Sequence, residues 1–269
     1  MMKEILQQGG RRGGIMIQYL WFDLGYTLVR TNREEVYRQV LERFGAFRSP
    51  EEIALAYHLS DKLFMREFQG VLGKDSRAYF PWYIGTLNYF LRLSLPIEEV
   101  VQVHRDLARE CPVQWKAYDG ALPTLRYLRS LGYRLGLISN WDESARDVLA
   151  RNGLDKELDE IVISSEVGME KPNPNIFRLA LARGGVAAEQ SLYIGDNYYD
   201  DVVGSREIGM PCLLINAYGS RGIEELSHRP VISGIRDVVA YLGHPMPPEL
   251  LNTEINRQGV YHDNDSGKN

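Results

Sequence analysis

Residues 17–28 read IQYLWFDLGYTL, a short apolar run that ends at a carboxylate. A run of this kind, bounded by turn residues, is typical of a buried strand. It is too short to cross a bilayer, which takes about 20 apolar residues, and no small-residue cleavage site follows it as in a signal peptide. We therefore predict a buried strand over Ile17–Phe22, with Asp23 at its carboxyl end.

Four further short apolar runs continue the pattern, and helix-like segments follow them until the tail begins. The runs are Tyr133–Ile138, Ile161–Ile163, Ser191–Ile194 and Pro211–Ile215. Strands that alternate with helices favour a parallel sheet with helices on its faces. The predicted fold class is therefore α/β, with a Rossmann-like parallel sheet as its core.

A long insertion between the first two strands contains no convincing strand. Apolar residues recur there at helical spacing in four segments: Glu34–Phe44, Glu51–Gln69, Arg77–Leu93 and Ile97–Glu110. We therefore predict an all-helical cap subdomain inserted into the core. The expected boundaries are a flexible lead at 1–14, a core of 15–30 and 116–242, a cap at 31–115 and a loosely ordered tail at 243–269, with Met16 as an alternative start.

The composition narrows the class of protein. The chain has 269 residues, of which 44% are hydrophobic and 25% charged, and these are globular values. A net charge of −5 argues against bulk affinity for nucleic acid or for an anionic membrane. The two cysteines, Cys111 and Cys212, form no disulfide framework, so a reducing, cytoplasmic location is expected.

Polar residues follow the predicted strands, at the edge where parallel sheets bind ligands. Asp23 follows the first strand, Ser139 and Asn140 follow the second, Lys171 lies beyond the third, and Asp196, Asp200 and Asp201 follow the fourth. A carboxylate such as Asp23 can attack phosphorus and form an aspartyl phosphate. The other acids can hold Mg²⁺, while a hydroxyl group and a lysine can bind phosphoryl oxygens.

These residue types also have structural interpretations. A carboxylate after a strand can cap a turn, Ser139 and Asn140 can form an ordinary N-cap pair, and adjacent acids suit the first turn of a helix. A capping role for Asp23 would not require a lysine and further acids at the other strand ends, so we favour the chemical interpretation. The spacing makes Asp201 the stronger metal-site candidate and Asp200 the alternate, but it does not decide which of the two contacts the ion directly.

The polar motifs, in this order, resemble those of the haloacid dehalogenase (HAD) superfamily over residues 17–242. The family's D-x-D-x-T-L motif is matched by Asp23, Thr27 and Leu28, its Ser/Thr motif by Leu137–Asn140, its Lys-Pro motif by Gly168, Lys171, Pro172, Ile176 and Phe177, and its G-D-x-x-x-x-D motif by Gly195, Asp196 and Asp201. One such motif is weak evidence, whereas four in order after predicted strands are specific. The helical insertion lies where the family's C1-type cap lies.

The resemblance implies a role for each site residue. Asp23, Ser139 and Lys171 would be catalytic, with Asp23 as the nucleophile. Thr27, Ser139, Asn140 and Lys171 would bind the phosphoryl group, and Asp23, the Gly25 carbonyl, Asp196 and Asp200 or Asp201 would hold Mg²⁺. The implied protein is a Mg²⁺-dependent hydrolase of a small phosphorylated substrate, a monomer or homodimer without nucleic-acid or membrane partners.

One position departs from the phosphatase pattern. Family phosphatases carry a second Asp as general acid and base two residues after the nucleophile, and this chain has Gly25 there. Such catalysis typically contributes about 10²–10⁴-fold, so reduced or atypical activity is expected. Five residues near the predicted sheet edge are candidates to replace the acid: Tyr26, Asp142, Glu143, Tyr198 and Tyr199.

Gly25 also leaves other functions open. One is a catalytically impaired protein that binds metal and a phosphorylated ligand. The 2-haloacid dehalogenases lack the second Asp too, but Asp196 and Phe177 do not fit their pattern. The phosphonoacetaldehyde hydrolases use a Schiff-base lysine of the cap, for which this chain offers Lys62 and Lys74.

Overall fold

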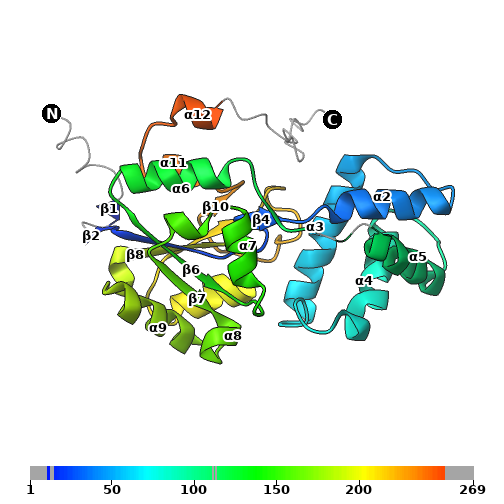
Figure 1. The fold of residues 1–269 in the computed structure, drawn as a ribbon, viewed down its shortest axis with the longest axis horizontal. Helices are drawn as coiled ribbons and strands as arrows, with labels where there is room; N and C mark the ends of the chain where they lie inside the picture. Colours follow the sequence, from blue (N-terminus) through cyan, green and yellow to red (C-terminus); the bar gives the residue numbers. More distant parts are fainter. Residues whose placement is uncertain (1–10, 13–14, 111, 113, 252–269) are drawn as a thin grey trace, which may run out of the picture.

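The core of the protein is a six-stranded parallel sheet (Figure 1). The computed structural model describes residues 11–12, 15–110, 112 and 114–251. The strands are β3 (Tyr19–Phe22), β6 (Arg134–Ser139), β7 (Glu160–Ile163), β8 (Ser191–Gly195), β9 (Cys212–Ile215) and β10 (Val231–Ile232). The first five match the predicted runs, and the α/β prediction is confirmed. The sixth, β10, was not predicted because two residues carry no detectable periodicity.

The strand order β10-β9-β8-β3-β6-β7 reverses at β3. The chain runs from β3 to β6 and β7 on one side, and then crosses to β8 and β9 on the other. Phe22, the last residue of β3, pairs with Leu137 of β6 and Ile194 of β8. Ligands bind in such folds at the carboxyl ends of the strands, where the order reverses. Asp23 is therefore placed at the expected position for a ligand site.

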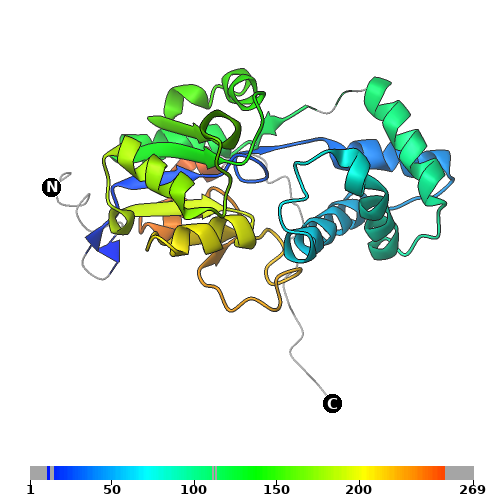
Figure 2. The ribbon, with the colours of Figure 1, turned by 90° about the horizontal axis from the view of Figure 1, so that it is seen from below.

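Helices cover both faces of the sheet. Leu20 and Phe22 of β3 pack into one apolar cluster with α6 (Ala121–Ser130), α7 (Ala145–Arg151) and α11 (Asp237–Tyr241). Tyr19 and Trp21 point to the other face, because successive side chains of a strand alternate. They pack there with α9 (Pro174–Gly184) and with η3 (Tyr198–Val202), which leads into α10 (Val203–Arg206). Figure 2 shows the two helical layers on either side of the sheet.

The insertion forms the predicted all-helical cap, which has an apolar cluster of its own. Its helices are α2 (Arg33–Arg43), α3 (Pro50–Glu67), α4 (Ser76–Phe90) and α5 (Ile97–Glu110). Ser49 and Glu52 form a capping box that fixes the start of α3. Of the four helices, α3 lies next to the core (Figures 1 and 2). No helix in the described part of the chain is long and apolar enough to cross a membrane.

The two chain segments that enter and leave the cap are hydrogen-bonded to each other. β4 (Val29–Arg30) pairs antiparallel with β5 (Lys116–Ala117), with Val29 opposite Ala117. This ribbon joins the strand end that carries Asp23 to the cap. Neither strand was predicted, because each is only two residues long.

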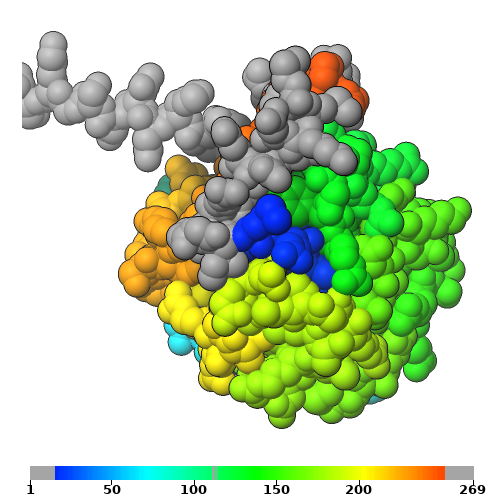
Figure 3. All heavy atoms as spheres, turned by 90° about the vertical axis from the view of Figure 1, so that its left-hand side faces the viewer, coloured from blue at the N-terminus to red at the C-terminus, as the bar shows by residue number. Residues whose placement is uncertain are grey.

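The described parts of the predicted lead and tail contain regular structure. Within the lead, β1 (Arg11–Arg12) pairs antiparallel with β2 (Ile15–Met16). Within the tail, α12 (Pro248–Leu251) buries Leu250 in the core cluster. Figure 3 shows the face opposite the cap, where the first described residues, in blue, lie between green and yellow-green core segments. Residues 1–10, 13–14 and 252–269 lie outside the described structure.

A buried ion pair anchors the cap near the ribbon. The Arg33 guanidinium lies between the rings of Tyr26 and Tyr57, 4.2 and 4.4 Å from their centroids. It pairs through both terminal nitrogens with Asp61 of α3, and the Tyr83 hydroxyl donates to Asp61 Oδ1 at 2.5 Å. The network ties α2, α3 and α4 to the loop after β3.

Asp61→Asn should destabilise the cap, because it leaves a largely buried guanidinium with only the longer contact to Glu34, at 3.4 Å, as a carboxylate partner. Removing one member of a buried pair typically costs about 3 kcal/mol or more, and we expect a loss of that order in the free energy of unfolding, measured by urea titration. Glu35→Gln is the control, since it breaks the exposed pair with Arg38 and should cost less than about 1 kcal/mol. Equal losses in the two variants would contradict the anchoring role of Asp61.

Candidate active site

A buried lysine lies at the centre of the candidate site. Lys171 Nζ is 2.7 Å from Asp23 Oδ1, 2.7 Å from Asp201 Oδ1 and 3.0 Å from the Tyr193 hydroxyl. These three acceptors match the three N–H donors of an ammonium group. Burial would lower the pKa of Lys171, but the charges of Asp201 and Asp23 hold it well above its ordinary value. Lys171 therefore remains a cation that holds two acids of different strand ends.

The nucleophile candidate is held by only one of its oxygens. Lys171 binds Asp23 Oδ1, and among the described residues no hydrogen bond reaches Oδ2. The backbone N–H of Asp23 donates to the Ile194 carbonyl at 2.9 Å, which fixes the main chain at the end of β3. Asp23 is therefore oriented by its neighbours while one oxygen stays available.

Asp201 is used within the protein through both oxygens. Oδ1 binds Lys171, and Oδ2 accepts the backbone N–H of Asn197 at 2.9 Å. The carboxylate lies directly on Gly195, where any Cβ atom would overlap it. The glycine of the G-D-x-x-x-x-D pattern is thus required by close packing, and Asp201 supports Lys171.

Asp196 and Asp200 carry charge that the protein only partly compensates. Burial raises the pKa of Asp196 to about 7, with Lys62 opposing the rise and Asp23 adding to it. Burial also raises the pKa of Asp200 to about 7, opposed by Lys171 and assisted by Asp201. Oxygen donors with excess negative charge suit Mg²⁺. As they stand, however, the described residues include no group of three metal-ligating side chains close enough to hold an ion.

The Asn140 side chain holds the backbone of Lys171. Its Oδ1 accepts the backbone N–H of Lys171 at 2.7 Å, and its Nδ2 donates to the Lys171 carbonyl at 2.9 Å. Both polar atoms of the side chain contact the backbone of Lys171, while Nδ2 has a second N–H, and the phosphate contact of Asn140 stays a prediction. Asn140 fixes the position of Lys171 relative to β6.

Ser139 and Thr27 lie at the sheet edge expected for phosphate contacts. Ser139 ends β6 and is buried. The Thr27 hydroxyl is also buried, and it has no hydrogen-bond partner among the described residues. Buried polar groups are normally hydrogen-bonded. An oxygen of a bound ligand would satisfy the Thr27 hydroxyl.

The space beside Gly25 is occupied by an indole ring. A Cβ atom at this position would lie 3.2 Å from Trp141 Cζ3. The Trp141 ring packs edge-to-face on Trp115, with ring centroids 4.7 Å apart, and Trp115 packs in the same way on Tyr26. The motif residue that would carry the second Asp therefore faces an aromatic wall.

None of the described hydrogen bonds of the five candidate acids reaches Asp23. The Tyr26 hydroxyl contacts Thr31, and Asp142 accepts the backbone N–H of Ser144. The Tyr199 hydroxyl donates to Glu225, and the Tyr198 ring packs against Tyr199 and His228. Glu143 is exposed. Burial also raises the pKa of Tyr26 well above its ordinary value, which makes it a weaker acid. The structure thus offers no ready replacement among these five residues.

From the sequence, Lys62 is a candidate only as a Schiff-base lysine for the phosphonate reaction, together with Lys74. The Lys62 ammonium reaches from α3 of the cap into the core, where Nζ donates to the Asp196 carbonyl at 2.5 Å and lies 3.5 Å from Asp196 Oδ2. Lys74, the other cap lysine, pairs with Glu170 at the surface. The spacing along α3 gave no sign of which face meets the core, so only the folded arrangement separates the two lysines.

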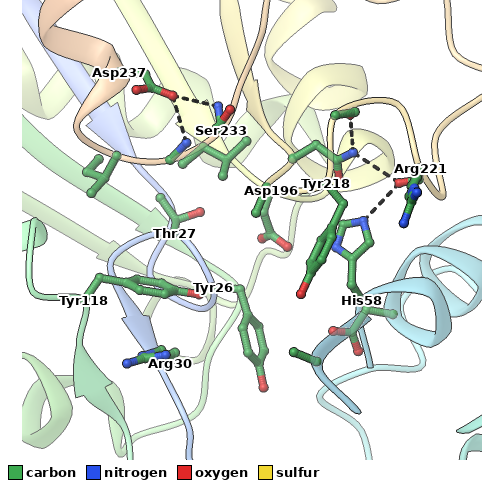
Figure 4. Close-up of a pocket in the computed structure, with 18 of the residues that line it drawn as sticks. Tyr26, Thr27, Arg30, His58, Tyr118, Asp196, Tyr218, Arg221, Ser233 and Asp237 are labelled. Atoms are coloured by element: carbon green, nitrogen blue, oxygen red, sulfur yellow. Dashed lines mark hydrogen bonds between the residues drawn. The ribbon is translucent and has the colours of Figure 1, made fainter. Parts of the chain in front are cut away.

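A cavity of about 550 Å³ lies between the cap and the core, beside Asp196 and Thr27. The rings of Tyr26, Tyr118 and Tyr218 line it (Figure 4). Its size is within the range of small-molecule sites. Of the candidate site residues, Thr27 and Asp196 line this space, which can accept the body of a small substrate, whereas Asp23 and Lys171 are not among its lining residues.

Comparison with known proteins defines the class. The model of the haloacid dehalogenase-like hydrolase family matches residues 17–209. The chain therefore belongs to the haloacid dehalogenase-like hydrolases, as the motifs predicted.

Two named groups of relatives stand out. The chain is 31% identical over 206 residues to glyceraldehyde 3-phosphate phosphatase of Methanopyrus kandleri, covering 72% of this chain and 82% of that protein. It is 33% identical over 172 residues to haloacid dehalogenase-like hydrolase domain-containing protein 3 of Mus musculus, covering 62% and 63%. The name of the second group carries the same family description as the matching model.

Solved structures support the fold alone. A HAD hydrolase of Bacillus subtilis, YfnB, bound to magnesium, gives a TM-score of 0.56 at 18% identity and covers 84% of this chain and 98% of that one. A dehalogenase in an intermediate complex also gives 0.56, at 19% identity, and covers 86% and 99%. The fold therefore does not separate phosphatase from dehalogenase chemistry.

Gly195→Ala should disrupt the site, because its Cβ atom would displace Asp201 from Lys171. Overpacking together with a broken buried ion pair should cost about 3 kcal/mol or more in the free energy of unfolding. Gly25→Ala is the matched control, since its Cβ atom meets only the edge of one ring and should cost about 1 kcal/mol. Urea unfolding of both variants checks this, and a Gly195→Ala variant as stable as Gly25→Ala would contradict it.

Proposed function

We propose that the protein is a Mg²⁺-dependent phosphatase that acts on a small phosphorylated metabolite through an aspartyl-phosphate intermediate. The observation that carries the proposal is the Asp23–Lys171–Asp201 arrangement at the strand ends. The cavity between cap and core, which Thr27 and Asp196 line, offers space for a substrate. The names of the archaeal phosphatase relatives support a small phosphorylated substrate.

Asp23 Oδ2 is the proposed attacking atom. It forms a bond to phosphorus as the bond from phosphorus to the ester oxygen breaks, and the leaving group departs toward the cavity. Water then attacks the phosphorus of the aspartyl phosphate, which releases inorganic phosphate and restores Asp23. Lys171 holds Asp23 Oδ1 throughout and keeps the carboxylate aligned. Thr27 and Ser139 are the proposed hydrogen-bond donors to the phosphoryl oxygens.

The proposed residues for holding Mg²⁺ are Asp23, the Gly25 carbonyl, Asp196 and Asp200. Asp200 is preferred to Asp201, because both Asp201 oxygens are already bound within the protein. When bound, Mg²⁺ supplies positive charge for the phosphoryl oxygens. The raised pKa values of Asp196 and Asp200 support this assignment, since a cation would compensate their charge.

The remaining assignments are proposals too. We propose a cytoplasmic monomer or homodimer without nucleic-acid partners. A second candidate function is a HAD-fold protein that binds metal and phosphorylated ligand with impaired turnover, which Gly25 and its aromatic wall favour. A 2-haloacid dehalogenase or a phosphonate hydrolase is less favoured. Against the phosphonate hydrolase, Lys62 contacts the Asp196 backbone and carboxylate, and nothing in its described surroundings indicates a carbonyl substrate.

Asp23→Asn should abolish phosphate release, because the amide is a far weaker nucleophile than the carboxylate. We expect at least roughly a thousandfold loss in a phosphate-release screen of alkyl, aryl and acyl phosphates, run with and without Mg²⁺. Asp142→Asn, which alters an exposed acid of the neighbouring loop, is the control and should leave the rate unchanged. A parent protein without Mg²⁺-dependent release from any ester would refute the proposed turnover.

Gly25→Asp should raise activity only when Trp141 is also replaced by a smaller side chain. The new carboxyl group needs the space that the indole ring occupies, so we expect little gain in the single variant. In Gly25→Asp/Trp141→Leu we expect a gain of about tenfold or more, since general acid catalysis contributes about 10²–10⁴-fold. Trp141→Leu alone is the control, and alkyl phosphate turnover is the measurement. An equal gain in the single and double variants would show that Trp141 does not restrict the position.

A further inference from the structure

One face of α3 is docked on the core segment that follows β9. His58, Lys62 and Arg66 share this face, because residues four apart lie above one another on a helix. His58 Nε2 is 3.0 Å from the Arg221 carbonyl, and Arg66 Nη1 is 3.3 Å from Glu225 Oε2. The contacts before and after Lys62 thus hold this part of the cap against the core.

The core is shaped to admit the stem of Lys62. Gly222 has a φ of +78°, and a Cβ atom there would lie 3.0 Å from both Cβ and Cγ of Lys62. A side chain at position 222 would therefore push the lysine away. With glycine in place, the Lys62 side chain is 93% buried and its ammonium reaches Asp196.

Lys62 lines the same cavity as Thr27, one of the proposed phosphoryl contacts. Lys62, Thr27 and Asp196 all line that cavity. Lys171, the other ammonium of the site, has its three donors engaged by Asp23, Asp201 and Tyr193. Lys62 Nζ donates to the Asp196 carbonyl at 2.5 Å, and its other two contacts are weaker: Asp196 Oδ2 lies 3.5 Å away and the sulfur of Met65, a weak acceptor, 3.8 Å away. Donor capacity therefore remains on the cap side of the site.

On the basis of the proposed phosphatase function, we infer that Lys62 is a catalytic residue that contacts the leaving-group oxygen of the substrate. As the bond from phosphorus to the ester oxygen breaks, negative charge develops on that oxygen, and the Lys62 ammonium stabilises it electrostatically. The departing alkoxide takes its proton from water, and Lys62 stays an ammonium throughout. The lysine thus supplies, as fixed charge, part of what the acid missing at Gly25 supplies in other phosphatases.

The dependence of the rate on the leaving group tests this inference. A good leaving group such as p-nitrophenolate needs little stabilisation, whereas a glycerol alkoxide needs much. Lys62→Met keeps the apolar stem against Gly222 and removes the charge. We expect kcat/KM for glycerol phosphate to fall about 100-fold or more, while that for p-nitrophenyl phosphate falls less than about tenfold. Lys62→Arg should restore part of the glycerol phosphate rate.

Arg66→Met is the matched control, because it alters the same face of α3 outside the cavity and should change neither rate. Equal losses on the two esters in Lys62→Met would overturn the inference, since they would show that Lys62 acts through Asp196 or through cap docking. If Lys62→Met fails to fold, Lys62→Gln takes its place, and a ratio of the two rates equal to that of the parent overturns the inference. A parent inactive on every ester of the phosphate-release screen would refute the proposed function itself.

Discussion

The charge of Lys171 is the constraint around which the site is built. A buried ammonium is costly unless it is paired and its donors are satisfied. Its acceptors are Asp23 after β3, Tyr193 in β8 and Asp201 after β8, while Asn140 after β6 holds its backbone. The ends of three strands must therefore converge for the charge to be stable, and this convergence orients the nucleophile candidate.

Adjacent residues of α3 connect the cap to this site. Asp61 points into the cap, where it pairs with Arg33 and accepts from Tyr83. Lys62 points into the core and contacts Asp196. Because the two side chains lie on neighbouring faces of one helix, any rotation of α3 would break both contacts. The internal order of the cap and the charge it contributes to the site are therefore coupled.

The fold and the core half of the site could be predicted from the sequence, because both follow from local patterns. Carboxyl ends of parallel strands meet at one edge, so Asp23, Lys171 and the acids after β8 had to be close. The roles of Asn140 and Lys62 could not be predicted. The first depends on which polar groups meet once the loops have folded, and the second on which face of α3 docks. The two-residue strands β4, β5 and β10 are too short to show periodicity.

The surroundings of Gly25, and not the glycine alone, differ from those that an acid at this position would need. The indole of Trp141 lies against that position, and Trp115 and Tyr26 continue the aromatic wall toward the cap ribbon. An acid at position 25 would therefore have to enter packed aromatic surface, where a carboxylate is costly. The positive charge of Lys62 reaches Asp196 from the cap, past a glycine that leaves room for it. The absence of an acid at position 25 and the presence of the cap lysine are thus parts of one proposed arrangement. In it, the negative charge on the leaving-group oxygen is stabilised from the cap and not from the loop after β3.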